Sequence, residues 1–524
     1  MIIGVVRGIG DNPNEFEFIT PDVSKMSIGD FVTLEHDGME IISRINECRP
    51  LTDYPPVMYS NPEIPPSRIA EILGDEEKEL YVVRATILGY FDEESGEFVN
   101  PRIIPRQGSQ VKYASEELLK KCLNRKTSGR GIAHIGYMLT RRDVRVPIYL
   151  DVSAIASEHM CILASTGSGK SYLAGVIVEE LLSPRNMASV LIFDPHGEYH
   201  TLVEMMNREE FREGWYSPEV EVIPSERIKI RFSELEVSDI SASLPEMSER
   251  METLLRRAYE MISSEPIITR ALLKRAIVEI AEEDESMRNT ARALLWRIDR
   301  VFDQSRIFDD FEHLSLQRLF SPGKCTILDL SSMGDWEQQM VALIILRKLL
   351  HARMMTERGN ASGESYLPYP VFIILEEAHR FAPRGGDSRA LPIIRRILSE
   401  GRKFGIGVCL ISQRPSKIDG DVLSQCMTSV IMRIVNPSDQ ESIRISVESV
   451  GREVLKELPG LTKGQAIVSG RAVNTTVLIK VRERLTPHGG ESKNAPEEWR
   501  RYLESKRGRE ILPLEDEEIE VLRT

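Results

Sequence analysis

The stretch ASTGSGKS, residues 164–171, follows an apolar run over residues 159–164 and precedes a helical pattern over residues 172–182. A strand, a turn containing glycines and a helix, in that order, are the setting of a phosphate-binding loop. In such a loop the backbone N–H groups converge on phosphate oxygens. The stretch therefore predicts a nucleotide-binding P-loop at the carboxyl end of a buried strand.

The residues of this loop have separate expected parts in binding ATP. Gly167 and Gly169 let the backbone wrap tightly, Lys170 reaches the β- and γ-phosphates, and the Ser171 hydroxyl is offered to Mg²⁺. Ala164 stands where the motif usually has its first glycine, and its backbone has less freedom than that of glycine. The predicted nucleotide-binding residues are Ser165, Thr166, Gly167, Ser168, Gly169, Lys170, Ser171 and Tyr172.

Short apolar strands alternate with helical patterns from about residue 150 onward. The further strands are expected at residues 189–194, 325–330, 371–377, 407–413 and 429–435. Nearly continuous apolar strands indicate a parallel sheet with helices on both faces. We therefore predict an α/β fold. It has a RecA-like P-loop ATPase core, an N-terminal small β-barrel, an inserted helical bundle and a C-terminal helical extension.

The pattern along the chain predicts six regions. Short strands separated by turn residues indicate a barrel at the N-terminus. Apolar residues three and four positions apart indicate helices inserted between the second and third core strands. The regions are the β-barrel (1–115), a helical and basic connector (116–149), the first part of the ATPase core (150–232), the helical bundle (233–320), the second part of the core (321–490), and a C-terminal helix with an acidic tail (491–524).

Two carboxylates end the strand VFIILEE within residues 371–379. Glu376 is expected to support the Mg²⁺ shell, and Glu377 is expected to polarise the attacking water. Two acids at this position suit hydrolysis, because a water nucleophile needs a positioned acceptor. The alternative is a strand that simply ends in solvated acids.

Three more polar residues lie at strand or helix ends. Asp194, in FDPHGEY, is expected to order the metal's waters or Glu377, or else to form a turn before Pro195. Gln413, in ISQRP, is placed to sense the γ-phosphate, or is an ordinary polar residue at a strand end. Arg402 is either an arginine finger for a neighbouring subunit or a cation favoured by a helix dipole.

Charge and composition restrict the partners. With 67 Lys and Arg against 81 Asp and Glu, the net charge of −14 argues against non-specific coating by nucleic acid or anionic lipid. Residues 380–403 nevertheless hold seven basic and two acidic residues. This segment is part of a ring lumen that touches phosphates, or a solvated helix face or subunit interface. No apolar run reaches 18 residues, so no membrane partner is expected. The six cysteines form no Cys-x-x-Cys pair, which fits a reduced cytoplasmic setting.

The chain resembles archaeal HerA proteins of the HerA–FtsK class of ATPases. The resemblance rests on ASTGSGKS (164–171), LIFDPHGEY (191–199), FIILEEAHRF (372–381), EGRKFG (400–405) and ISQRP (411–415), in that order. It implies a homohexameric ring that pumps double-stranded DNA and works with a NurA-type nuclease in recombinational repair. It also implies that Lys170 and Ser171 bind nucleotide and metal, that Glu377 is the catalytic acid, and that Arg402 acts in trans.

Three other functions stay open at this point. One is a peripheral secretion or conjugation ATPase of the same superfamily. Another is a ring that binds ATP without being a motor and serves as a platform for a nuclease; the intact Lys170, Glu377 and Arg402 argue against it. The third is a subunit of a rotary ATPase, suggested by the barrel, although FDPHGEY and ISQRP favour HerA.

Overall fold

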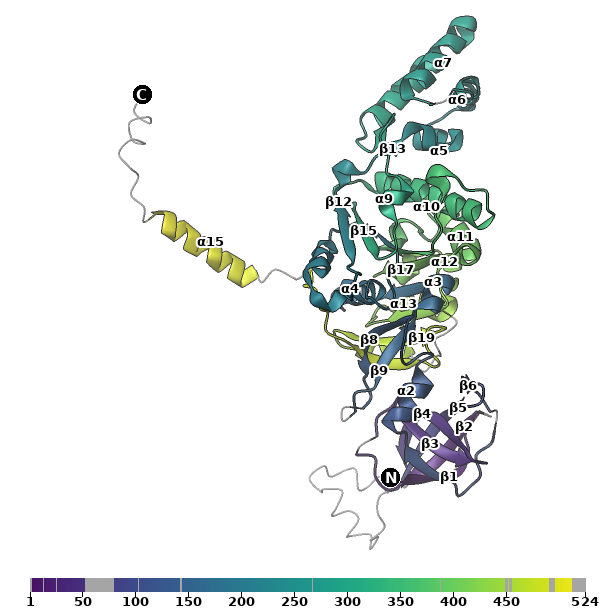
Figure 1. Ribbon diagram of the computed structural model, residues 1–524, viewed down its shortest axis with the longest axis vertical. Helices are drawn as coiled ribbons and strands as arrows, with labels where there is room; N and C mark the ends of the chain where they lie inside the picture. The colour runs from purple at the N-terminus through teal and green to yellow at the C-terminus, as the bar shows by residue number, and fades with distance from the viewer. Residues whose placement is uncertain are drawn as a thin grey trace, which may run out of the picture.

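The computed structural model describes residues 2–12, 14–24, 26–51, 80–101, 103–141, 144–265, 267–386, 388–447, 451, 455–489 and 495–510, with side chains as far as residue 505. A β-barrel lies at one end of the long axis, a helical projection lies at the other, and a large sheet with its helices lies between them (Figure 1). The predicted fold class is confirmed. The acidic tail predicted at the C-terminus lies outside the described residues.

The central sheet has eleven strands, and its order explains where a ligand can bind. Their spatial order is β12 (Glu219–Ile223), β15 (Lys324–Asp329), β11 (Val190–Asp194), β16 (Val371–Leu375), β17 (Ile406–Ser412), β10 (Met160–Leu163), β18 (Thr428–Ile431), β19 (Gln465–Gly470), β20 (Val477–Val481), β8 (Ile132–Met138) and β9 (Pro147–Asp151). The strands from β12 to β18 are parallel, and those from β19 to β9 continue the sheet in antiparallel pairs. All the parallel strands therefore present their carboxyl ends at one edge, where open α/β sheets bind ligands.

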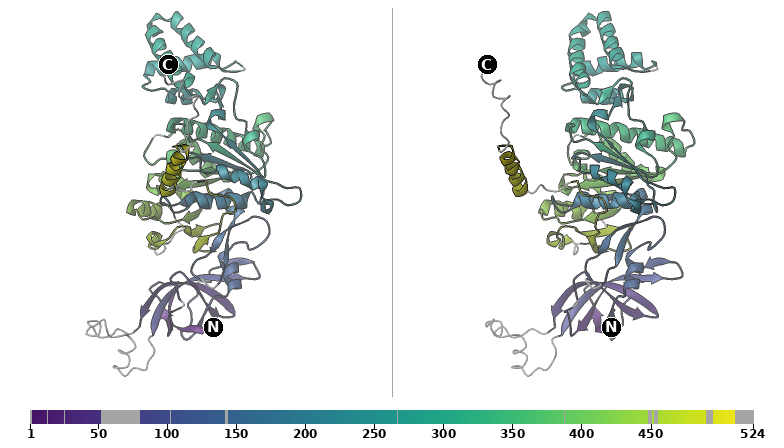
Figure 2. Two further views of the ribbon diagram at one scale, coloured as in Figure 1. Left: turned by 90° about the vertical axis from the view of Figure 1, so that its left-hand side faces the viewer. Right: turned by 60° about the vertical axis from the view of Figure 1, so that its left-hand side comes forward.

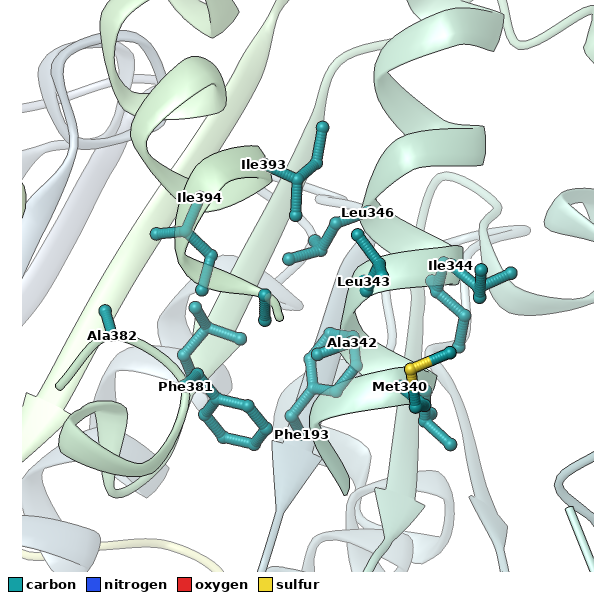
Figure 3. Close-up of a cluster of buried hydrophobic side chains, with 14 of the residues drawn as sticks. Phe193, Met340, Ala342, Leu343, Ile344, Leu346, Phe381, Ala382, Ile393 and Ile394 are labelled. Carbon is teal, nitrogen blue, oxygen red and sulfur yellow. The ribbon is translucent and has the colours of Figure 1, made fainter. Parts of the chain in front are cut away.

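The strands are apolar on both faces because helices cover both faces. On β11, Leu191 and Phe193 join one hydrophobic core, while Val190 and Ile192 join the other. The first core includes α10 (Asp335–Glu357) and α11 (Leu391–Glu400), and the second includes α4 (Lys170–Leu181). Figure 3 shows Phe193 of β11 among residues of α10 and α11. Smaller helices of the core are α3 (Val152–Glu158), α9 (Leu316–Leu319), α12 (Gly420–Ser424) and α13 (Pro437–Ser446).

The N-terminal strands close into a barrel of six. Their order is β2 (Glu15–Thr20), β1 (Ile2–Ile9), β7 (Gln110–Tyr113), β3 (Phe31–His36), β4 (Met39–Pro50) and β5 (Tyr81–Asp92), and β5 pairs back to β2. A short strand, β6 (Glu97–Val99), extends β5. Phe16, Phe18 and Val32 fill the barrel interior, because alternate residues of each strand point inward.

The region predicted as a helical connector differs in the structure. Among the described residues of that region, only α2 (Glu116–Leu123) is helical, while β8 and β9 are antiparallel strands of the central sheet. Their buried residues include Ile135 and Ile148, which pack in the core beneath α4. The sequence predicts a helical and basic connector here, but long-range pairing of β8 with β20 makes this part of the chain belong to the sheet.

A helical projection rises between β12 and β15 (Figures 1 and 2). Its helices are α5 (Val237–Ser243), α6 (Glu249–Ile262), α7 (Arg270–Glu283) and α8 (Arg288–Ile298), and the pair β13 (Ile230–Arg231) and β14 (Phe308–Asp309) forms its base. Ser248 and Thr269 cap α6 and α7 with their side chains.

The last described helix, α15 (Ala495–Glu510), stands apart from the body of the molecule (Figures 1 and 2). Within the described ranges, no helix combines the length and the apolar composition that a membrane-spanning segment requires.

Glu179 of α4 is fully buried and accepts hydrogen bonds from the segment that follows β20. Its Oε1 accepts hydrogen bonds from the Thr486 backbone N–H at 2.7 Å and the Thr486 hydroxyl at 2.8 Å. Its Oε2 accepts from Arg482 Nη1 at 2.9 Å, and the Arg484 guanidinium lies 3.7 Å from Oε1. The segment after β20 is therefore held against the helix that follows the P-loop.

We expect Glu179→Ala to lower stability by about 3–5 kcal/mol, because it leaves the buried Arg484 guanidinium without its counter-charge. The midpoint of urea unfolding, followed by circular dichroism, measures the loss. Glu441→Ala is the control, since Glu441 is exposed and pairs with Arg444 on the same helix. It should cost no more than about 0.5 kcal/mol. Equal midpoints for the two variants would contradict the prediction.

His159, at the start of β10, ties three parts of the core together. Its buried ring accepts the Val408 N–H at Nδ1 (3.2 Å) and donates from Nε2 to the Leu398 carbonyl oxygen (3.1 Å). Burial lowers the pKa of this imidazole to about 4. The ring is therefore neutral in the folded protein at neutral pH.

The His159 pKa predicts a loss of stability as pH falls. Between about pH 6.5 and 4 the unfolded chain binds a proton at His159 that the folded chain does not, so stability decreases by about 3 kcal/mol over that range. Stability curves of His159→Gln should lack this part of the slope. His351→Gln, which replaces an exposed histidine of α10, is the matched control. Parallel curves for His159→Gln and the unaltered chain would contradict the assignment.

Candidate active site

The P-loop joins β10 to α4 at the carboxyl edge of the sheet. Gly167 and Gly169 have φ angles of 77° and 104°, in the left-handed region that favours glycine, and Gly169 is the N-cap residue of α4. Ala164 has no such requirement: its φ is not positive, and its N–H continues the strand by donating to the Ser412 carbonyl oxygen at 3.2 Å. Alanine is therefore compatible with the first position of the motif.

Lys170 points into a cluster of carboxylates. Its ammonium group forms ion pairs with Glu376 Oε1 and, at 3.2 Å, with Glu377 Oε1. Burial lowers the pKa of Lys170, but the two negative charges outweigh this effect and the pKa is raised. Lys170 is thus fully protonated and ready to bind phosphate oxygens.

Glu376 and Glu377 follow β16 but have different surroundings. Glu376 is fully buried and accepts a hydrogen bond from the Tyr199 hydroxyl at 2.6 Å; burial raises its pKa to about 6 despite Lys170. Glu377 lines the pocket and adopts a left-handed φ of 51°. Burial tends to raise the pKa of Glu377, yet His379 and Lys170 lower it to about 2. Glu377 is therefore the ionised acid that lines the pocket.

The turn that carries Glu377 is anchored by Phe381. The Phe381 ring packs edge-on against Phe193 of β11, with 6.1 Å between ring centroids, and Figure 3 shows both beside Ala342 of α10. The Glu377 carbonyl oxygen also accepts the Arg380 N–H at 2.8 Å. The backbone of this turn is thus fixed on the apolar core, which holds Glu377 in its uncommon conformation.

Asp194 organises a turn and does not line the pocket. Its carboxylate accepts backbone N–H groups from His196 at 3.2 Å, Gly197 at 2.8 Å and Tyr199 at 3.1 Å. The turn presents Glu198, whose Oε2 accepts a hydrogen bond from the Ser171 hydroxyl. Glu198 was not predicted, although the motif FDPHGEY contains it. Asp194 thus acts on the site through the backbone of this turn, and Glu198 contacts it directly.

Gln413 and a further wall complete the pocket. Gln413 Oε1 accepts from the Thr166 hydroxyl at 2.6 Å, which links the end of β17 to the P-loop. The pocket has a volume of about 980 Å³. Its far wall was not predicted from the sequence, because it comes from strands distant in the chain: Lys463, Gly464, Lys480, Val481, Glu483 and His488. The ring of His488 lies 5.7 Å from that of Tyr172.

Arg402 lies away from these residues. It belongs to the turn just before β17, at the amino edge of the parallel sheet, and its Nη2 lies 3.2 Å from Glu158 Oε1. The charge of the surrounding basic segment, residues 380–403, is partly neutralised by acidic side chains. Of its seven cations, Arg380, Arg395, Arg396 and Arg402 each form an ion pair with an acidic side chain.

The oxygen atoms at Ser171 suit a magnesium ion that enters with a nucleotide. Among the described residues, no three His, Cys, Asp or Glu side chains are grouped to hold a metal. Mg²⁺ needs no such group, because it binds phosphate oxygens, waters and one or two protein oxygens. Ser171 and the adjacent Glu198 supply such hard donors. The predicted ligand Glu376 is occupied by Lys170 and Tyr199 instead.

The chain is similar to known proteins over most of its length. Residues 133–349 match the family model described as "Helicase HerA, central domain". The chain is 28% identical to the DNA double-strand break repair helicase HerA of Pyrococcus furiosus, with 91% of this chain and 92% of that protein covered. It is 25% identical to the protein of the same name from Saccharolobus solfataricus, with 97% of each covered. Among solved structures, VirB4 of Thermoanaerobacter pseudethanolicus has a TM-score of 0.48 at 16% identity, covering 68% of this chain and 97% of that one.

We expect Glu198→Gln to raise the Mg²⁺ concentration needed for half-maximal ATP hydrolysis by about 10-fold, because the Ser171 hydroxyl loses its charged partner. Titration of ATPase activity with Mg²⁺ at saturating ATP measures this change. Glu204→Gln, which replaces an exposed acid of the same region, should leave the titration unchanged. A curve for Glu198→Gln that coincides with that of the control would refute the role.

Proposed function

Since the chain belongs to the HerA family of ATPases, we propose that it is an ATP-driven translocase of double-stranded DNA. In this proposal it works in the cytoplasm as a homohexameric ring, together with a NurA-type nuclease, in the processing of DNA ends for recombinational repair. The names of its relatives as DNA double-strand break repair helicases support this assignment.

One observation carries the proposal: Arg402, the predicted arginine finger, and the P-loop lie at opposite edges of one sheet. Arg402 precedes the first residue of β17, while Gln413 follows the last. β17 has seven residues, so about 20 Å of strand separates the two edges. An arginine side chain cannot span that distance, so Arg402 can serve only the nucleotide of another subunit. A head-to-tail contact of this kind generates a ring when the rotation closes.

The site geometry supports hydrolysis of ATP. The phosphates would lie on the N–H groups of the P-loop and draw Lys170 from Glu376 and Glu377. Glu377, ionised at neutral pH, would accept a hydrogen bond from the attacking water and orient it toward the γ-phosphorus. The water oxygen bonds to the γ-phosphorus while the bond from that phosphorus to the bridging oxygen breaks, so ADP leaves with the bridging oxygen and the proton of the water passes by way of Glu377 to the phosphate product. Arg402 of the next subunit stabilises the charge that develops. Mg²⁺ supplies further charge neutralisation when it is bound.

Contacts with DNA would come from local cations, because the net charge of the chain is −14. Arg384 and Lys417 are exposed and lie on neighbouring loops, since the Arg384 N–H donates to the Lys417 carbonyl oxygen at 2.7 Å. Repeated around a ring, such loops would track the phosphate backbone without reading base sequence.

The experiment is steady-state ATP hydrolysis with and without linear duplex DNA. We expect stimulation by the duplex and loss of activity in Lys170→Ala, which removes the phosphate-binding ammonium group. Glu377→Gln should keep ATP binding but lower kcat by about 10²–10⁴-fold, because the general base is lost.

Hydrolysis that is indifferent to duplex DNA, with or without a NurA-type nuclease present, would overturn the DNA motor and favour a protein-transporting ATPase. Normal hydrolysis by Glu377→Gln would overturn the catalytic assignment. A ring that binds ATP but hydrolyses none would be a platform without motor activity.

A further inference from the structure

Glu158 connects Arg402 to a second arginine at the amino edge of the sheet. Glu158 ends α3 just before β10, and its Oε1 lies 3.2 Å from Arg402 Nη2 and 3.2 Å from Arg471 Nη1. The two guanidinium groups thus share one oxygen atom and are no more than twice that distance apart. The second oxygen of Glu158 is buried, and among the described residues it has no hydrogen-bond partner.

Arg471 is held by its backbone, while its side chain is exposed. It begins the turn between β19 and β20, its N–H donates to the Met427 carbonyl oxygen at 3.0 Å, and its carbonyl oxygen accepts from Arg125 Nη1 at 2.8 Å. The Arg471 side chain is 58% exposed and that of Arg402 is 62% exposed. Both guanidinium groups can therefore contact a surface brought against this edge.

The turn that carries Arg402 is also rigid. The buried Arg353 of α10 donates from Nε to the Phe404 carbonyl oxygen at 2.6 Å and from Nη1 to the Leu367 carbonyl oxygen. His159 fixes the neighbouring ends of α11 and β17. The backbone on both sides of this site is thus already in place. When another subunit approaches, only the side chains of Arg402, Arg471 and Glu158 need to be aligned with its nucleotide.

The local charge suits a phosphate group. Two guanidinium groups against one carboxylate leave a net charge of +1, and the donors that Glu158 does not occupy face outward. The Glu158 side chain is only 10% exposed, but both arginine side chains are more than half exposed, and ion pairs with exposed partners contribute little to stability. Stability alone therefore does not explain why two arginines share this carboxylate. Two arginines at this spacing can instead donate charge-assisted hydrogen bonds to different oxygens of one phosphate chain.

We propose that Arg471 enters the nucleotide site of the neighbouring subunit together with Arg402, and that Glu158 is the positioning residue that aligns the two. This inference rests on the proposed ring, in which Arg402 acts in trans. Arg471 is then a second catalytic residue that stabilises charge on the transferring phosphate. Glu158 keeps both guanidinium groups together before the neighbour's nucleotide reaches them.

Mixed rings test the inference. Arg471→Ala subunits keep a complete P-loop site but cannot supply Arg471, whereas Lys170→Ala subunits have an inactive site but can supply both arginines. Alone, Arg471→Ala should lose about 10- to 100-fold in kcat, the effect of one charge-assisted hydrogen bond. Rings co-expressed from both variants should hydrolyse ATP faster than the two homogeneous rings together. Arg444→Ala, an exposed arginine paired on its own helix, is the control and should be fully active.

The same experiment with Arg402→Ala separates the two proposals. Lys170→Ala subunits could restore ATP hydrolysis in rings mixed with Arg402→Ala subunits but not in rings mixed with Arg471→Ala subunits. That result would overturn the role of Arg471 and leave the proposed ring, with Arg402 acting in trans, unchanged. Failure of both pairs, with intact hexamers in analytical ultracentrifugation, would overturn the action in trans itself. Full activity of the homogeneous Arg471→Ala ring would also overturn the inference.

Glu158→Gln tests alignment as distinct from folding. In the otherwise unaltered chain we expect it to lower kcat about 10-fold with little change in KM. In a chain that already carries Arg402→Ala and Arg471→Ala it should lower kcat no further, because no arginine is left to align. An equal loss in both backgrounds would assign Glu158 a structural role and overturn its part in the proposal.

Discussion

The structure depends on the pairing of a largely buried ammonium group, that of Lys170, with two buried carboxylates. Lys170, Glu376 and Glu377 lie together beneath the P-loop, and an unpaired charge at this depth would be strongly unfavourable. Lys170 pairs with one oxygen of each carboxylate, and Tyr199 donates to the second oxygen of Glu376. A nucleotide that takes Lys170 must therefore leave the carboxylates to other donors. Nucleotide binding is therefore coupled to the ion pairs of Glu376 and Glu377, the two acids that would act on the nucleotide.

The direction of the parallel strands distributes the functional groups. Every residue that follows a parallel strand reaches one edge, and every residue that precedes one reaches the other. Lys170, Glu377 and Gln413 consequently gather at the carboxyl edge, while Glu158 and Arg402 gather at the amino edge. The helical projection is inserted between β12 and β15, at one end of the strand order. It therefore leaves the carboxyl and amino ends of the central strands β10 and β17 unaltered.

The sequence predicts the motifs better than the directions of their side chains. The P-loop, the strand before Glu376 and the strand before Gln413 follow from local patterns, because apolar runs and glycines act over short distances. Which of Glu376 and Glu377 faces the pocket depends on a left-handed backbone at Glu377, which no local pattern indicates. Glu198 was missed because it lies four residues beyond its strand, and only the hydrogen bonds to Asp194 turn it toward Ser171.

Long-range pairing explains the other differences. β8 and β9 join the sheet through β20, more than three hundred residues later in the chain, so their sequence alone reads as a basic connector. The wall formed by Lys480 and His488 reaches the pocket for the same reason, because Glu179 holds the segment after β20 against α4. This attachment places the end of the ATPase core on the helix that begins at Lys170. A ligand that moves the P-loop therefore bears on the segment that follows β20, because Glu179 belongs to the helix that begins at Lys170.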